Sequence, residues 1–177
     1  MSKFLVIAEK PSVAQSYAKN LSAYKREDGY LEGESCIVSW CLGHLAEYAQ
    51  PEEYDPKYEK WQFDDLPILP EAWKLKVSKD KKKQFEVIKT LMNRSDVEYL
   101  VNGCDAGREG ELIFQRVYDL AGCRKPVKRL WISSMEDAAI QKGFQTMKSE
   151  EEYKNLCMAA VCRAQADWLI GMNGARA

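Results

Sequence analysis

The chain has 177 residues, of which 46% are hydrophobic and 30% are charged, so it can bury the core of one globular domain. Its formal net charge is −1, which argues against a strongly basic nucleic-acid-binding module and leaves any such contact to local features. We expect neither a signal peptide nor a membrane span. The six cysteines form no Cys-x-x-Cys pair, which excludes the usual zinc signatures and favours free thiols in a reducing cytoplasm.

The first predicted elements are a buried strand and a helix. Residues 3–8 form a nearly continuous apolar run, which is typical of a strand buried on both faces. Pro11 suits the first turn of a helix, and apolar residues recur at helical spacing over 11–21. Glu9 and Lys10 therefore lie between a strand end and a helix start, where Lys10 is suited to a phosphate. The alternative is a surface Glu–Lys pair of little energetic weight.

The middle of the chain combines two short predicted elements with a long insertion. Residues 25–34 are polar with two glycines and predict a turn between strands, and 35–40 predict a strand. His44 would contact substrate or metal, or be a hydrogen-bonded structural histidine. The insertion, about 45–80, is rich in proline and aromatic residues, and we expect little regular structure in it. Its aromatic side chains would stack unpaired bases or, as we favour, pack the insertion onto the sheet.

Helices and strands alternate in the rest of the chain, which predicts an α/β class with a largely parallel sheet. The basic run 79–83 would contact a DNA backbone or form a solvated helix start. Further strands are expected over 97–102 and 127–132, and further helices over 109–121, 135–147 and 151–171. Another helix should follow the basic run, with Phe85, Ile88 and Met92 on its apolar face.

The stretch 103–111, Gly-Cys-Asp-Ala-Gly-Arg-Glu-Gly-Glu, is the strongest functional signal, because it places three carboxylates at a strand-to-helix turn. Ligands of open α/β sheets bind outside the carboxyl ends of the strands. Asp105 and Glu109 offer the oxygen ligands that Mg²⁺ prefers, and Arg108 suits a phosphate. Glu9 would face the same rim of a parallel sheet and complete the site. The alternative is a solvated turn with an acidic helix start.

Four blocks of this sequence resemble the Toprim domain of type IA DNA topoisomerases, and the topoisomerase III branch is the more similar one. The blocks are residues 5–14, residues 43–70, residues 105–111 and residues 163–173. The resemblance runs in order through nearly the whole chain. It implies a Toprim fold, with a mostly parallel central sheet flanked by helices, over residues 1–150. It also implies that 151–177 begin a second, DNA-binding helical domain.

The resemblance implies a role for each residue of the predicted metal and phosphate site. Glu9 resembles a Mg²⁺ ligand and proton-transfer group, and Lys10 resembles a lysine that stabilises the transition-state phosphate. Arg108 matches an arginine that helps to hold the active site. Asp105 and Glu109 match the first and last acids of an Asp-x-Asp-x-Glu pattern, and both are expected to bind the metal.

The same resemblance implies contacts with DNA near the end of the chain. Arg163 and Asp167 match residues that contact the strand upstream of the cut, although as an i, i+4 pair they would otherwise simply pair on the surface. We assign Arg176 to the same group. The expected partners are single-stranded DNA and the remaining topoisomerase domains, and we expect a monomer.

Gly107 stands where the acidic pattern has its middle acid. One possible metal ligand is therefore missing. The pattern favours a single Mg²⁺, with Mn²⁺ as a substitute, held by Glu9 and Asp105 with waters and a DNA phosphate. Whether Glu109 touches the metal or supports Arg108 stays open.

None of the nine tyrosines lies in a motif that resembles the nucleophilic tyrosine of these enzymes. We therefore expect an N-terminal fragment that binds metal but does not cut. The full enzyme would cut, pass and reseal single DNA strands without ATP. The alternatives are a metal-dependent Toprim nuclease, in which activated water replaces the tyrosine, and a non-catalytic Toprim interaction module.

Overall fold

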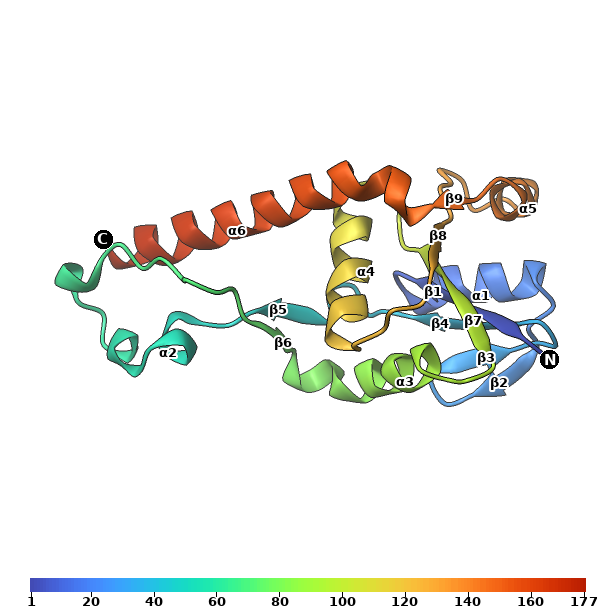
Figure 1. The fold of residues 1–177 in the computed structure, drawn as a ribbon, viewed down its shortest axis with the longest axis horizontal. Coiled ribbons are helices and arrows are strands. Elements are labelled where there is room, and N and C mark those ends of the chain that lie inside the picture. Colours follow the sequence, from blue (N-terminus) through green and yellow to red (C-terminus); the bar gives the residue numbers. More distant parts are fainter.

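A seven-stranded sheet forms the centre of the computed structural model, which describes all 177 residues (Figure 1). Its strands are β1 (Lys3–Ala8), β2 (Lys25–Glu27), β3 (Tyr30–Glu32), β4 (Cys36–Trp40), β7 (Val97–Gly103), β8 (Val127–Arg129) and β9 (Lys148–Ser149). They lie in the order β2-β3-β4-β1-β7-β8-β9, and β4, β1, β7 and β8 run parallel to one another. The predicted α/β class with a mostly parallel central sheet is therefore confirmed.

Helices cover both faces of this sheet. They are α1 (Pro11–Asn20) and α5 (Asp137–Gln145) on one face, and α3 (Lys82–Met92) and α4 (Arg108–Leu120) on the other. Alternate side chains of β1 divide between the two layers: Leu5 and Ile7 pack with α3 and α4, whereas Val6 and Ala8 pack with α1. The apolar N-terminal run is thus a strand buried on both faces, as predicted.

Two predicted segments differ from the observed elements. Residues 25–34, expected to be only a turn, form the β2–β3 hairpin. Gly29 takes a φ of +86° between the two strands, which glycine adopts without steric cost. The strand expected over 127–132 ends at Arg129, which is its last residue in register with a residue of β7.

The insertion contains more regular structure than predicted. β5 (Ala46–Tyr48) and β6 (Leu75–Val77) form a separate antiparallel ribbon, and α2 (Pro51–Tyr54) and two 3-10 turns lie between them. The prediction that the aromatic residues pack onto the sheet is wrong, since the helices already cover both of its faces. Tyr48, Tyr54 and Trp73 instead pack around Trp168 of the C-terminal helix.

That C-terminal helix, α6 (Lys154–Arg176), follows a 3-10 turn at Glu150–Tyr153 and is the longest element. It packs across α4 and then runs out beside the insertion, so the two form an arm that extends from the sheet (Figure 1). Trp168 is buried where the helix faces the insertion, and Asp167 is exposed. None of the helices has the length and apolar character needed to cross a bilayer.

Candidate metal and nucleic-acid site

Glu9 and Asp105 lie at the same edge of the sheet, just beyond the ends of two strands. β1 and β7 are neighbouring parallel strands, with Ala8 in register with Gly103. Glu9 follows the end of the first strand, and Asp105 lies two residues beyond the end of the second. The backbone N–H of Asp105 donates to the Glu9 carboxylate at 2.9 Å. The sequence prediction that the two strand ends face one rim is therefore confirmed.

The electrostatics of this pair suit a bound cation. Partial burial is the largest cause of a raised pKa at Glu9, and the nearby Asp105 carboxylate raises this pKa further. The hydrogen bond from the Asp105 N–H acts in the opposite direction. Two close carboxylates, one of them partly desolvated, repel each other unless a proton or a cation lies between them. Mg²⁺ typically uses one or two protein carboxylates together with waters and substrate phosphates, so the donor set fits this ion.

Glu109 does not join this pair, because no group of three metal-ligating side chains converges in the structure. Its carboxylate instead contacts Nε2 of His44, from the loop before β5. Sequence reasoning named both residues but did not pair them, because they lie 65 positions apart and on separate elements.

Two glycines shape the backbone of the acidic loop. Gly107 takes a φ of +148°, which side chains rarely adopt, immediately before α4 begins. A Cβ on Gly110 would lie 1.9 Å from the carbonyl oxygen of Asp105, so the first turn of α4 can approach the loop only with glycine there. The tight turn holds the Asp105 backbone against the helix start.

A buried charge beneath the loop was missed in the sequence. The Arg129 guanidinium donates to the carbonyl oxygens of Cys104 at 2.6 Å and of Asp105 at 2.8 Å. It also forms an ion pair with Glu111, and both side chains are fully buried. A buried arginine needs such partners, and here they fix the backbone of Asp105 from below. The sequence offered little signal, because Arg129 is one of two adjacent basic residues in the predicted strand 127–132.

Four of the predicted site residues line one groove of about 430 Å³ between α4, α6 and the loop that carries His44. They are Arg108, Glu109, Arg163 and Asp167. Arg163 and Asp167 also form an ion pair at 3.8 Å, and both side chains stay largely exposed. The groove thus presents several cations beside the acidic loop, as expected for a path along a phosphate backbone.

Lys10 and Arg176, which were also predicted to contact phosphate or DNA, lie outside this groove. Lys10 and Asp105 line a second groove, beside the start of α1. The Arg176 guanidinium packs against the insertion: it donates to the carbonyl oxygen of Tyr58 at 2.7 Å and lies over the Trp61 ring. Only 6% of its side chain is exposed, so it is not available to DNA in this conformation.

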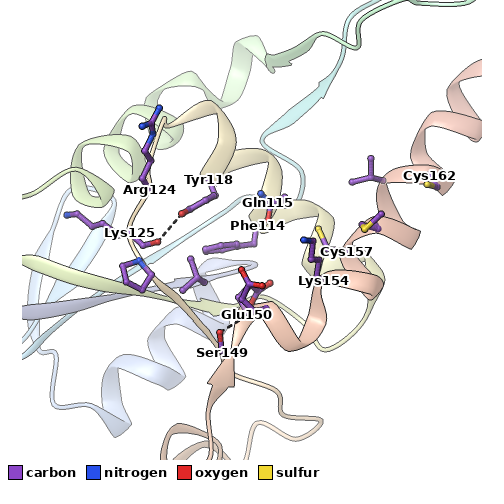
Figure 2. Close-up of a pocket in the computed structure, with 15 residues that line it drawn as sticks. Phe114, Gln115, Tyr118, Arg124, Lys125, Ser149, Glu150, Lys154, Cys157 and Cys162 are labelled. Atoms are coloured by element: carbon purple, nitrogen blue, oxygen red, sulfur yellow. Dashed lines mark hydrogen bonds between the residues drawn. The ribbon is translucent and has the colours of Figure 1, made fainter.

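A further cavity lies apart from these residues (Figure 2). It measures about 720 Å³ and lies between α4, the segment leading into β8 and the start of α6. Phe114 and Tyr118 form part of its wall, and Glu150 and Lys154 lie on the side of α6. None of the residues predicted to bind metal or DNA lines it.

The fold and the acidic rim define a class of domain. A family model described as "Toprim domain" matches residues 4–135, and the chain therefore belongs to the Toprim domain family. Topoisomerase I from Thermotoga maritima has the same fold, with a TM-score of 0.61 and 20% identity over 94% of this chain and 24% of that one.

Closer similarity is found among bacterial sequences. The chain is 50% identical over all 177 residues to "DNA topoisomerase 3" of Bacillus subtilis. It is 51% identical over the same length to "DNA topoisomerase 3" of Bacillus cereus. In both cases the match covers 24% of the relative, so the chain spans about a quarter of the length of these proteins.

Proposed function

We propose that this chain is the metal-binding Toprim domain of a bacterial DNA topoisomerase III. In the full enzyme, single DNA strands would be cut, passed and resealed without ATP, and this chain would be inactive by itself. The observation that carries the proposal is the pair of Glu9 and Asp105 carboxylates at one sheet edge, beside a groove lined by arginines. The identity with proteins named DNA topoisomerase 3 supports it.

The proposed metal is Mg²⁺, with Mn²⁺ as a substitute. Glu9 and Asp105 would hold it, whereas Glu109, at the start of α4, contacts His44 instead. When bound, the ion would supply positive charge to a phosphate in the site. Lys10 and Arg108 would add charge from the protein, since both are exposed at this rim.

The proposed nucleic-acid partner is single-stranded DNA. Arg163 and Asp167 support this proposal, because they line the groove with Arg108 and remain accessible. The proposal that residues 151–177 begin a DNA-binding helical domain is supported by the way α6 leaves the sheet (Figure 1). The remaining topoisomerase domains would be its other partners. The proposed compartment is the cytoplasm, where the six free thiols would stay reduced, and we propose a monomer.

Mn²⁺ binding to the chain, measured by EPR, tests the proposed site. Glu9→Gln and Asp105→Asn should each weaken binding about tenfold or more, because each removes one of two charged ligands. Glu98→Gln is the matched control, since this exposed glutamate lies near the other end of β7. Wild-type affinity in both site variants would refute the site. Nicking of DNA by the chain alone with Mn²⁺ would instead indicate a Toprim nuclease.

A further inference from the structure

The backbone around His44 is held in place from two sides. The N–H of Gly43 donates to the carbonyl oxygen of Glu9 at 3.1 Å, which ties the loop to the end of β1. Gly43 takes a φ of +67°, so the chain turns sharply just before the histidine. Lys81 Nζ donates to the carbonyl oxygen of His44 at 2.8 Å. The imidazole therefore starts from a fixed position beside the acidic rim.

Both ring nitrogens of His44 have a partner. Nε2 contacts the Glu109 carboxylate, and Nδ1 lies 3.4 Å from Nη1 of Arg116. A guanidinium can only donate hydrogen bonds and a carboxylate can only accept them. The Arg116 contact is therefore a hydrogen bond only when Nδ1 carries a lone pair. The proton then lies on Nε2, from which the ring donates to Glu109.

Arg116 is itself well placed to impose this arrangement. Nη1 also donates to the carbonyl oxygen of Ala46 at 3.3 Å. The guanidinium lies over the Tyr48 ring, 4.8 Å from its centroid. These contacts fix the donor that faces His44, and α4 carries both Arg116 and Glu109. One helix thus contacts both sides of the imidazole.

We propose that Arg116 is a positioning residue that acts through His44 on Glu109. It keeps the imidazole as the Nε2–H tautomer, and the imidazole holds the Glu109 carboxylate in the groove. The Glu109 carboxylate then lines the groove and is not a ligand of the metal. Glu9 and Asp105 remain as the two protein ligands. The inference rests on the proposed function, and it deepens it by giving Glu109 a role apart from the metal.

NMR of the ¹⁵N-labelled chain tests the tautomer directly, because His44 is the only histidine and its ring signals cannot be confused with others. Long-range ¹H–¹⁵N correlations at mildly alkaline pH should show a protonated Nε2 and an unprotonated Nδ1. A protonated Nδ1 would overturn the proposal.

Substitution of Arg116 tests whether it is the cause. Arg116→Met should shift the Nδ1 resonance and increase the mobility of the ring, whereas Arg116→Lys, which keeps a donor, should restore much of the wild-type signal. Arg124→Met is the matched control, since this exposed arginine follows the end of the same helix. Unchanged His44 signals in Arg116→Met would refute the positioning role. A loss of stability with unchanged ring signals would likewise leave Arg116 merely structural.

Mn²⁺ binding separates this inference from the proposed function. Glu109→Gln should change the Mn²⁺ dissociation constant by less than about twofold, while Glu9→Gln weakens binding about tenfold or more. Equal weakening in the two variants would make Glu109 a ligand and overturn the inference, with the metal site intact. If neither variant weakens binding and the NMR signature holds, the metal site fails and the Arg116–His44–Glu109 arrangement stands.

Discussion

Gly107 and Gly110 carry no functional group, yet they decide where the Asp105 carboxylate can lie. The first allows the chain to turn with a φ of +148°, and the second lets α4 approach the Asp105 carbonyl oxygen. Arg129 completes the support from the buried side. The acidic motif therefore depends on its backbone conformation as well as on its charges, and its two glycines are as constrained as its acids.

Glu150 gives a prediction for a single residue. Burial is the main cause that raises its pKa to about 8, and the neighbouring Glu111 carboxylate adds to the effect, while Arg129 opposes it. Between about pH 4.5 and pH 8, the Glu150 carboxyl is therefore protonated in the folded protein and ionised in the unfolded chain, where its pKa is 4.5. This contribution to stability is complete below about pH 4.5 and is lost as the pH rises to about 8.

In Glu150→Gln the melting temperature should therefore decrease less between pH 4.5 and pH 8 than in the wild type. The amide stays neutral at every pH, as the protonated acid is only at low pH. The Tm gain at the alkaline end should be a few degrees, given about 2–4 °C per kcal/mol for a chain of this size. Thermal unfolding followed by circular dichroism measures it, with the exposed neighbour in Glu151→Gln as the control. Parallel Tm–pH curves for wild type and Glu150→Gln would contradict the prediction.

At the scale of elements, α6 and the insertion depend on one aromatic cluster. Trp168 packs edge-on against Tyr54 and Trp73, with ring centroids 5.7 and 5.3 Å away, and its indole N–H donates to the carbonyl oxygen of Ala49 at 3.1 Å. This cluster is separate from the two clusters that cover the sheet. The arm should therefore open independently of the sheet.

Trp168→Ala should release the arm without unfolding the sheet. Loss of a buried tryptophan costs about 3–5 kcal/mol, and here that cost falls on the arm, because the apolar cluster of Trp168 is separate from the two clusters that cover the sheet. Hydrogen exchange should become fast in β5, β6 and the second half of α6 and stay slow in β1 and β7. Ile170→Ala, at an exposed position of the same helix, is the control. Equal loss of protection in the sheet would show a single cooperative unit.

At the scale of the whole molecule, charge is placed locally on a nearly neutral chain. The net charge is only −1, but Arg108, Arg116 and Arg163 line one groove. We therefore assign the proposed affinity for single-stranded DNA mainly to that groove, because the chain as a whole carries no net positive charge. Such an affinity should be weak and should fall steeply with salt.

The salt dependence of oligonucleotide binding gives the matching prediction. Arg163→Ala should reduce the slope of log K against log salt by about 0.7, the value for one phosphate contact on a single strand. Arg176→Ala should leave the slope unchanged, because its guanidinium is occupied by the insertion. Fluorescence anisotropy of a labelled single strand measures both slopes. The reverse result would return Arg176 to the DNA and remove Arg163 from it.

Local pattern was enough to predict the sheet class and the pair at its edge. The apolar runs before Glu9 and Asp105 predicted two buried parallel strands, and parallel strands end at a common edge, so the two acids had to meet there. The motif blocks and the family resemblance depend only on the order of residues, and the match of the Toprim model to residues 4–135 confirms the family.

Contacts between distant segments decided the rest. The insertion packs on α6 and not on the sheet. The Arg176 guanidinium contacts the insertion, and the His44 ring contacts Glu109. None of these pairings follows from periodicity, because each depends on which surfaces remain uncovered after the core has formed. The sequence by itself determined the buried parallel strands β1 and β7 and the two acids at the rim, because continuous apolar runs predict such strands without any tertiary contact. Only the tertiary structure decided which partners Glu109, the arginines and the aromatic residues contact.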